Sequence, residues 1–363
     1  MYDIRYNEIA NEIEYKSKSE SDYKALNENT IYRVLQHNNI KFSMANLMAL
    51  LRSDFVPVYN PFTDYFEKLP VWQEGDPDYI DHIASYVIAK QPERFKIHFK
   101  KMLVRSIACA LVDGAFNKQA FILVHDKQNS GKSTFCRWLC PAELKSYYAE
   151  NISIDKDSLI SLSENFFINL DELATLSKME LNTLKSMFSK DYIKIRRPYD
   201  KKPTVAARRA NFIGSTNKME FLTDETGSVR WLCFEIEWIN WDYQKEVDLE
   251  KVWAQAYSLF KMGFKYQLNE KEINENESIN KDFQITTAEI DLIQKNYTPG
   301  TRERHQAFYT SSEMMQNLSE RYNSIKLNTI NLGKALKILG FEKCQQFNGQ
   351  YQVKGYYINY ITE

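Results

Sequence analysis

The sequence has 363 residues, of which 44% are hydrophobic and 26% are charged, and its formal net charge is −1. This length suits two or three domains, and the hydrophobic content excludes a disordered or collagen-like chain. The near-neutral charge excludes a chain that is basic throughout, so any nucleic-acid binding must come from a local patch.

The compartment is predicted from the N-terminus and the cysteines. The first residues, MYDIRYNEIANEIEYK, lack the basic-then-apolar pattern of a secretory signal, and apolar stretches such as QAFILV are too short to cross a bilayer. No two cysteines form a Cys-X-X-Cys pair. They are Cys109, Cys136, Cys140, Cys233 and Cys344. We therefore expect reduced thiols in a soluble cytoplasmic protein that has no membrane contact.

The predicted elements divide the chain into four parts. Residues 1–118 carry apolar residues at helical spacing and are expected to form a mostly helical N-terminal region or collar. Residues 119–265 alternate short apolar runs with helical patterns, which predicts a three-layer α/β core with a largely parallel sheet. Residues 266–300 read as a polar linker or helix. Residues 301–363 predict two helices and a hairpin turning at Asn348-Gly349, the plan of a winged-helix-like domain.

The stretch AFILVHDKQNSGKSTF has the pattern of a phosphate-binding P-loop, the Walker A motif. A buried strand, a loop and a helix start follow one another, and Gly131, Lys132 and Ser133 occupy their required positions. Lys132 is expected to reach the β and γ phosphates, and the Ser133 hydroxyl to hold Mg²⁺. Asp126 stands where the first glycine of the pattern is expected. Because Asp tolerates left-handed backbone geometry, we expect a weakened but working loop, with the Asp126 charge turned away from the phosphates.

Three further motifs along the chain contain residues that could serve nucleotide hydrolysis. FFINLDE places Asp171 and Glu172 at the end of a buried strand, where Asp171 is expected to bind Mg²⁺ and Glu172 to polarise the attacking water. In GSTN, Asn217 is the candidate to hold that water. In FLTDETGSVRW, Arg230 is the candidate to stabilise charge on the transferred phosphoryl group from a neighbouring subunit. The structural alternatives are a helix cap for Asp171, a turn for Asn217 and a surface side chain for Arg230.

A basic segment lies between the Asp171 and GSTN motifs. Residues 190–209 contain eight Lys or Arg and two Asp, and they read as a hairpin with PYDKKP at its tip. Basic residues with an aromatic among them suit a single-stranded nucleic acid, and the alternative is a solvated charged hairpin. The candidate DNA-binding residues are Lys194, Arg196, Arg197, Tyr199, Lys201 and Lys202.

The motifs NPFTDYFEKLPVW, QAFILVHDKQNSGKSTF, FFINLDEL, IRRPYDKKPTVAARRANFIGSTN and FLTDETGSVRW follow one another over roughly residues 55–260. In this order the sequence resembles the virulence-associated protein E family, a branch of the superfamily 3 helicase-like AAA+ ATPases. Relatives occur in phages and other mobile elements, often fused to a primase domain. Residues 1–100 lack the acidic metal-binding constellation of a primase. If priming is required, we expect a separate primase or initiator protein to supply it.

The resemblance implies a P-loop AAA+ core that binds ATP and Mg²⁺. The ATP-binding residues would be Gln128, Asn129, Ser130, Gly131, Lys132, Ser133 and Thr134. Asp171 and Glu172 would form Walker B, Asn217 would be the sensor, and Arg230 would act in trans between subunits of a homo-oligomeric ring, commonly a hexamer. The hairpin from Arg196 to Lys202 would enter the central channel and track single-stranded or forked DNA. Relatives often carry a double arginine where this chain has Val229-Arg230.

These observations favour an ATP-dependent, ring-forming DNA motor, a replicative helicase of a phage or other mobile element. One alternative is a non-translocating ATPase switch, such as a loader or a phage-interference factor, which Asp126 fits slightly better. Another is a P-loop kinase acting on a small molecule, against which the basic hairpin and the position of Arg230 argue. In the C-terminal segment, Lys334, Lys337 and Lys343 leave DNA binding and protein docking equally open.

Overall fold

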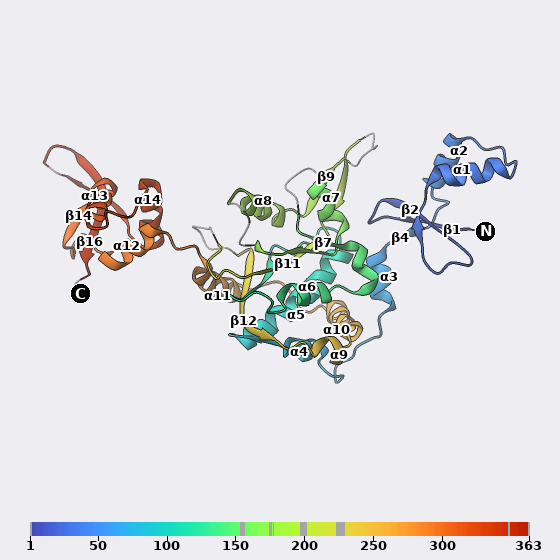
Figure 1. The fold of residues 1–363 in the computed structure, drawn as a ribbon, viewed down its shortest axis with the longest axis horizontal. Coiled ribbons are helices and arrows are strands. Elements are labelled where there is room, and N and C mark those ends of the chain that lie inside the picture. The colour runs from blue at the N-terminus through green and yellow to red at the C-terminus, as the bar shows by residue number, and fades with distance from the viewer. Residues whose placement is uncertain are drawn as a thin grey trace. The chain divides into compact units, whose positions relative to one another are not determined.

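The computed structural model describes residues 2–152, 157–173, 176, 178–196, 202–222, 229–347 and 349–361. The chain divides into two compact units, which are coloured by residue number in Figure 1. The first unit combines Met1–Met219 with Val229–Asn276, and the second combines Glu220–Ser228 with Glu277–Glu363. The motifs around Lys132, Asp171 and Asn217 fall in the first unit, as does Arg230, whereas the first part of the FLTDETGSVRW motif belongs to the second unit.

The first unit is built on a six-stranded sheet of order β5-β12-β6-β11-β8-β7. Its strands are β5 Val87–Ala89, β6 Ala120–Val124, β7 Tyr148–Glu150, β8 Phe167–Leu170, β11 Asn211–Thr216 and β12 Trp231–Ile239. All neighbours pair in parallel except β5, which runs antiparallel to β12. Every residue of β6, β8 and β11 is buried, as expected for parallel strands covered on both faces. The predicted α/β core with a largely parallel sheet is confirmed.

Several helices share the main hydrophobic core with this sheet. They are α3 Pro61–Lys68, α4 Tyr79–Ala84, α5 Pro92–Leu111, α6 Lys132–Trp138, η1 Ala142–Tyr147, α9 Tyr243–Glu246 and α10 Leu249–Lys261. The other helices are α7 Asp157–Glu164, α8 Lys178–Phe188 and α11 Glu270–Asn280, of which α11 extends into the second unit. The helix α5 starts with Pro92 at its first turn, where the missing N–H is harmless, and it buries most of its length. Phe121 of β6 stacks on Phe234 of β12 with ring centroids 4.6 Å apart. Packing of this density holds the ends of β6 and its neighbours in fixed positions.

His98 of α5 gives the fold a predictable dependence on pH. The side chain is 2% exposed, and within the described part of the chain its Nδ1 atom has no hydrogen-bond partner. Burial, together with the nearby Arg94 charge, lowers the pKa of His98 to about 4. The ordinary pKa is about 6.5, so the unfolded chain binds this proton more readily than the folded chain. The stabilising effect of a neutral His98 is therefore complete above pH 6.5 and is lost as the pH falls toward 4.

We expect this one residue to lower the free energy of unfolding by about 3 kcal/mol between pH 6.5 and pH 4. Denaturant unfolding of the wild type and of His98→Gln across this range measures the effect, because Gln stays neutral throughout. Above pH 6.5, the free energy of unfolding should change with pH equally in the two proteins. The exposed His37→Gln serves as the matched control, and an equal change of slope in that variant would contradict the assignment to His98.

The N-terminal region is less helical than the sequence analysis predicted. It contains α1 Glu28–His37 and α2 Met44–Leu51, but also a four-stranded sheet of order β3-β2-β1-β4. Its strands are β1 Tyr2–Asn7, β2 Glu12–Ser17, β3 Lys24–Ala25 and β4 Val58–Tyr59. The prediction was wrong here because each strand has six residues or fewer, so its two-residue alternation was hidden beside the longer helical patterns.

The second unit contains the helices and the hairpin predicted near the C-terminus. Its elements are η3 Lys281–Phe283, α12 Ala288–Asn296, β13 Tyr297–Pro299, β14 Ala307–Tyr309, α13 Ser311–Arg321, α14 Thr329–Ile338, β15 Lys343–Phe347 and β16 Gln352–Tyr360. β15 and β16 pair antiparallel, and Gly349 adopts a φ of 98° in the connecting turn, while Asn348 lies outside the described residues. Leu292 and Ile293 of α12 belong to the same core as α13 and α14, so the packed unit begins before residue 301.

Candidate nucleotide site

The loop between β6 and α6 places its left-handed residues elsewhere than we expected. Asn129 has a φ of 59° and Gly131 a φ of 86°, whereas Asp126 keeps a negative φ. The Asp126 side chain is 71% exposed and lies 3.4 Å from the Nδ1 atom of His125. The turn therefore depends on Asn129 and Gly131, and the missing glycine at position 126 causes no backbone strain.

Lys132 is held inside this loop by oxygen atoms. Its Nζ donates to the Ser130 hydroxyl at 2.7 Å and to the carbonyl oxygens of Lys127 at 3.1 Å and His125 at 3.3 Å. The residue is only 7% exposed, and burial lowers the pKa of its ammonium group. A buried cation whose hydrogen-bond acceptors are neutral lacks a counter-charge, and a bound anion would supply it.

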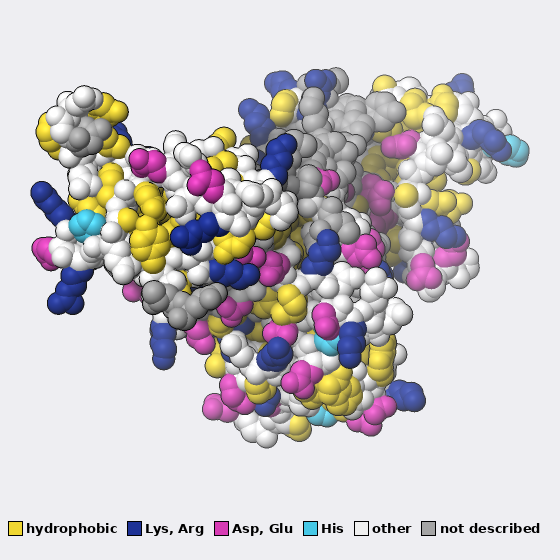
Figure 2. All heavy atoms as spheres, turned by 60° about the vertical axis from the view of Figure 1, so that its left-hand side comes forward, with side chains coloured by type: hydrophobic (Ala, Val, Ile, Leu, Met, Phe, Trp, Pro, Cys, Tyr) yellow, Lys and Arg dark blue, Asp and Glu magenta, His cyan; other side chains and the backbone are white. Residues whose placement is uncertain are grey.

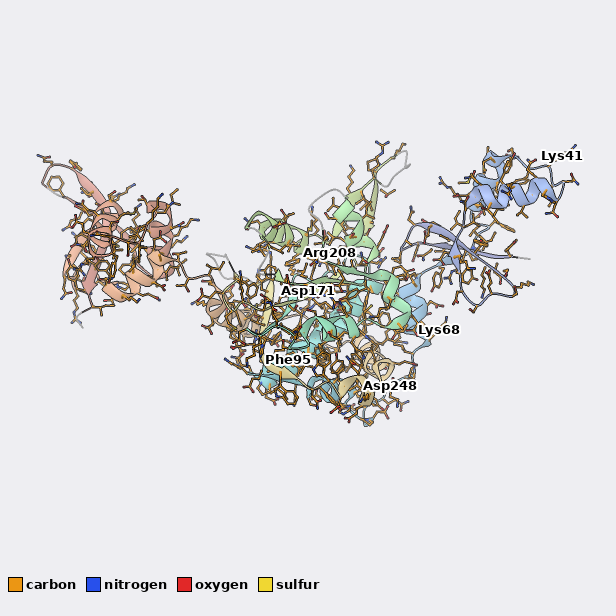
Figure 3. All side chains as sticks on the ribbon, viewed as in Figure 1. Lys41, Lys68, Phe95, Asp171, Arg208 and Asp248 are labelled. Atoms are coloured by element: carbon orange, nitrogen blue, oxygen red, sulfur yellow. The ribbon has the colours of Figure 1, made fainter. Side chains whose placement is uncertain are left out.

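Asp171, at the end of β8, is the centre of a compact hydrogen-bond cluster. Its Oδ1 atom accepts from the hydroxyls of Ser133 and Ser215, each at 2.6 Å, and these two hydroxyl oxygens are 3.0 Å apart. Its Oδ2 atom lies 3.4 Å from Arg137 Nη2. Burial raises the pKa of Asp171, but the bonds from Ser133 and Ser215 and the Arg137 charge outweigh it, so the pKa stays below its usual range. Asp171 is therefore an anion beside the start of α6, and it is labelled in Figure 3.

Arg137 contacts the Asp171 carboxylate and is itself held by Glu150. Arg137 projects from α6 and pairs with Glu150 at the end of β7, and Asn169 of β8 donates to the other Glu150 oxygen at 2.8 Å. The next residue, Glu172, adopts a φ of 51°, which is unusual for a residue with a side chain of this size. Such backbone strain is most often found at functional positions.

These elements enclose a pocket of about 210 Å³. It is lined by Gln128, Asn129, Lys132, Ser133, Asp171, Glu172, Ser215, Thr216 and Asn217. The structure thus brings together the predicted Walker A, Walker B and sensor residues. Of the predicted ATP-binding residues, Ser130, Gly131 and Thr134 do not line the pocket, although Ser130 contacts Lys132. Ser215 and Thr216 of β11 also line the pocket and were not selected from the sequence.

A larger pocket, of about 420 Å³, lies between α3, η1 and α10. Among the described residues that line it, four are acidic, namely Asp64, Glu143, Asp248 and Glu250, and one, Lys68, is basic. Four carboxyl groups would repel a phosphate, so this pocket does not suit a nucleotide.

Arg230 is placed apart from the 210 Å³ pocket. It lies just before β12, and both its Nε and Nη2 atoms donate to the Ser189 hydroxyl at 3.4 Å. It is not among the residues that line the pocket. Within one chain, the described part of the structure therefore leaves the pocket without Arg230.

The predicted basic hairpin is present in the described residues. β9 Tyr192–Ile195 pairs antiparallel with β10 Thr204–Ala207, and the two strands project away from the central sheet (Figure 1). Ile193 and Ile195 are buried, so the alternate residue Lys194 is exposed, as are Arg196 and Lys202. Arg197, Tyr199 and Lys201 lie outside the described residues.

Two further arginines anchor the base of this hairpin. Arg208 is fully buried and donates to the carbonyl oxygens of Asn117 at 2.7 Å, Ala210 at 3.0 Å and Phe188 at 3.2 Å. Arg209 donates to the Ala110 carbonyl and pairs with Asp113, both at 2.7 Å. These two residues of the basic segment are structural and hold the hairpin on the core.

Comparison with known proteins gives a family and a fold. The profile of the virulence-associated protein E-like domain matches residues 67–285. No curated protein sequence matches significantly. Among solved structures, the apo NrS-1 C-terminal region aligns with 99% of this chain and 96% of its own, with a TM-score of 0.53 and 12% identity. A second form of that region aligns with 99% and 97%, with a TM-score of 0.50 and 14% identity.

At these identities the similarity concerns the fold alone. The alignment with the NrS-1 C-terminal region covers nearly the whole chain. In the described part of this chain, no helix has the length and apolar character needed to cross a bilayer.

Proposed function

The chain belongs to the virulence-associated protein E-like domain family, and from this premise and the pocket geometry we propose that it is an ATP-driven, ring-forming DNA motor. In this proposal the first unit is a P-loop AAA+ core of the superfamily 3 helicase type, and the protein is a replicative helicase of a phage or other mobile element. The observation that carries the proposal is the single pocket that joins Lys132 and Ser133 with Asp171, Glu172 and Asn217.

The pocket fits a nucleoside triphosphate by its charge. Lys132 is a buried cation whose contacts are neutral oxygens, and a phosphate oxygen would replace them as its partner. The left-handed turns at Asn129 and Gly131 let the loop curve so that backbone N–H groups face inward. Asp171 and Glu172 line the same pocket, and in this proposal the terminal phosphate lies beside them.

The oxygen ligands fit Mg²⁺. Mg²⁺ takes oxygen ligands and is commonly bound by one or two carboxylates together with substrate phosphates. Ser133 and Asp171 supply a hydroxyl and a low-pKa carboxylate within 2.6 Å of each other. When bound there, the ion would neutralise charge on the phosphates. Among the described residues no cluster of three or more His, Cys, Asp or Glu forms a separate metal site.

The residues around the pocket then take distinct roles in hydrolysis. Glu172 orients and deprotonates the attacking water. It lines the pocket, and its backbone N–H donates to Asp171 Oδ1 at 3.1 Å. Asn217 holds the same water from the end of β11. Arg230, which lies outside the pocket of its own chain, serves the pocket of the adjoining subunit. Sites formed between subunits require an oligomer, and a head-to-tail interface that closes on itself gives a ring. A hexameric ring is the assembly that we propose.

The DNA contact is assigned to the hairpin of β9 and β10. On the face seen in Figure 2, Lys and Arg side chains stand among Asp and Glu side chains, in keeping with the net charge of −1. A local basic element must therefore supply the binding energy. Lys194, Arg196 and Lys202 are exposed on a hairpin whose base is fixed by Arg208 and Arg209. Nucleotide-dependent movement of this hairpin would pull one DNA strand.

The alternative of a non-translocating ATPase switch rested on Asp126. Because this side chain is exposed and does not line the pocket, it gives no reason for slow hydrolysis. A kinase that acts on a small molecule does not account for the exposed basic residues of the hairpin. We therefore retain the DNA motor as the proposed function.

The proposal is tested by ATP hydrolysis with and without single-stranded DNA. We expect DNA to raise turnover several-fold and ATP to shift the mass from the 42.8 kDa chain to a multiple of it. Lys194→Ala/Lys202→Ala should keep basal turnover and lose most of the stimulation, with a weaker salt dependence. The matched control is Lys265→Ala/Lys271→Ala, which removes the same charge from another exposed segment. A monomer whose turnover ignores DNA would overturn the proposal.

A further inference from the structure

Trp241 covers the backbone of the phosphate-binding loop. It lies in the turn between β12 and α9, and its side chain is 48% exposed. A methyl group placed on Gly131 would come within 3.0, 3.3 and 3.4 Å of the Cζ2, Cη2 and Cε2 atoms of the indole. The six-membered ring therefore rests on the loop at Gly131, between Asn129 and Lys132, which both line the pocket.

The turn that carries Trp241 is fixed on both sides. The Asn240 N–H donates to the Tyr86 carbonyl at 2.8 Å, and the Gln244 N–H donates to the Trp241 carbonyl at 3.2 Å. Tyr243 is buried, and its ring packs on Phe135 and Trp138 of α6 at centroid distances of 5.3 and 4.9 Å. Because α6 is also the helix that follows the loop, the indole and the loop are held by the same element. A large, half-exposed aromatic side chain in a rigid turn is a preorganised surface for a flat ligand.

The sheet order gives the direction in which a nucleotide would lie. Asp171, Glu172 and Asn217 come from β8 and β11, on one side of β6, so the reacting phosphate belongs on that side. β12 is the neighbour of β6 on the other side, and Trp241 follows it. A triphosphate with its terminal group toward Asp171 would leave its nucleoside on the side of Trp241.

We infer that Trp241 is the platform on which the nucleobase of the bound nucleotide stacks. The inference rests on the proposed nucleotide site and adds the residue that distinguishes a nucleoside triphosphate from a bare polyphosphate. Stacking uses the π-face that every base has, so its discrimination between bases is weak. We therefore expect ATP and GTP to bind with affinities within a few-fold of each other.

Titration calorimetry of the full chain with Mg-ATP and with Mg-tripolyphosphate tests the inference. We expect Trp241→Ala to weaken ATP binding by between about fivefold and a hundredfold, the range for loss of one base stack, and to leave tripolyphosphate binding unchanged. Trp241→Phe should recover most of the ATP affinity. Trp238→Ala is the matched control, because Trp238 is 50% exposed and lies in β12, three residues before Trp241. That variant should bind both compounds as the wild type does.

The outcomes separate this inference from the proposed function. If the wild type binds neither compound, the nucleotide site itself is wrong. If Trp241→Ala weakens both compounds equally, or neither, the indole only supports the loop and the inference fails. Photo-crosslinking of the wild type with 8-azido-ATP gives a readout that needs no variant. Label on the peptide that contains Trp241 supports the inference, and label confined to other peptides overturns it.

Discussion

Replacing Lys132 with Met is expected to lower ATP turnover by about two to three orders of magnitude while the nucleotide-free chain stays folded. The reason is that the ammonium group has no anionic partner at hydrogen-bond distance among the described residues and is held by the Ser130 hydroxyl and two backbone carbonyls. Burial lowers the pKa of this group, so its charge is disfavoured in the empty loop and favoured beside a phosphate. Function and stability should therefore respond differently to its removal.

Thermal unfolding without and with Mg-ATP measures the stability of the chain and its binding of nucleotide, and the turnover assay measures function. For the wild type, nucleotide at a hundred times its dissociation constant should stabilise the fold by about 2.7 kcal/mol. Lys132→Met should unfold near the wild-type temperature without nucleotide and show no shift with it. Lys127→Met is the matched control, because it removes an exposed lysine from the same loop. If Lys127→Met loses the nucleotide shift and Lys132→Met keeps it, the assignment of the buried lysine is wrong.

The parts of the site that could be predicted are those in which local pattern and position agree. The apolar run before Asp126 and the run FFINL each end in polar residues, and parallel strands bring such ends to one edge of a sheet. Ser133, the residue after Lys132, therefore meets Asp171 as expected, through a 2.6 Å hydrogen bond, and Lys132 lines the same pocket. Ser215 and Thr216 directly precede Asn217 and line the same pocket, so the whole polar end of β11 could have been selected from the sequence.

Other features depend on contacts between distant segments. Arg137 reaches Glu150 and Asp171 only because β7 pairs with β8 and α6 lies across both strand ends. Nothing in the spacing of these residues specifies that pairing. Trp241 meets Gly131 through a turn whose position is set by buried Tyr243. At Asp126 the sequence argument was wrong about the backbone, because the left-handed residues turned out to be Asn129 and Gly131. Tertiary packing decides such details, and local propensity is a weak guide to them.

Substitution of Arg230 is expected to cause the second large loss of ATP turnover. The proposed ring places its guanidinium in the adjoining subunit's site, where such an arginine commonly accelerates phosphoryl transfer by about a thousandfold or more. We expect Arg230→Ala to lose turnover on this scale while its affinity for nucleotide stays near that of the wild type. We expect unchanged affinity because this guanidinium acts chiefly on the charge that develops on the phosphoryl group in the transition state. Arg230→Lys should recover little, because an ammonium group lacks the planar fork of the guanidinium.

Mixing two inactive variants decides whether Arg230 acts between subunits. In rings that contain both Arg230→Ala and Lys132→Met chains, an interface is complete when an Arg230→Ala chain binds ATP and a Lys132→Met neighbour supplies its arginine. Random mixing in equal amounts completes about one quarter of the head-to-tail interfaces, so turnover should rise to about that fraction of the wild-type value. If Arg230 acted on its own chain's pocket, every chain in the mixture would lack one essential group. The mixture would then remain as inactive as its components, and the ring-based mechanism would have to be abandoned.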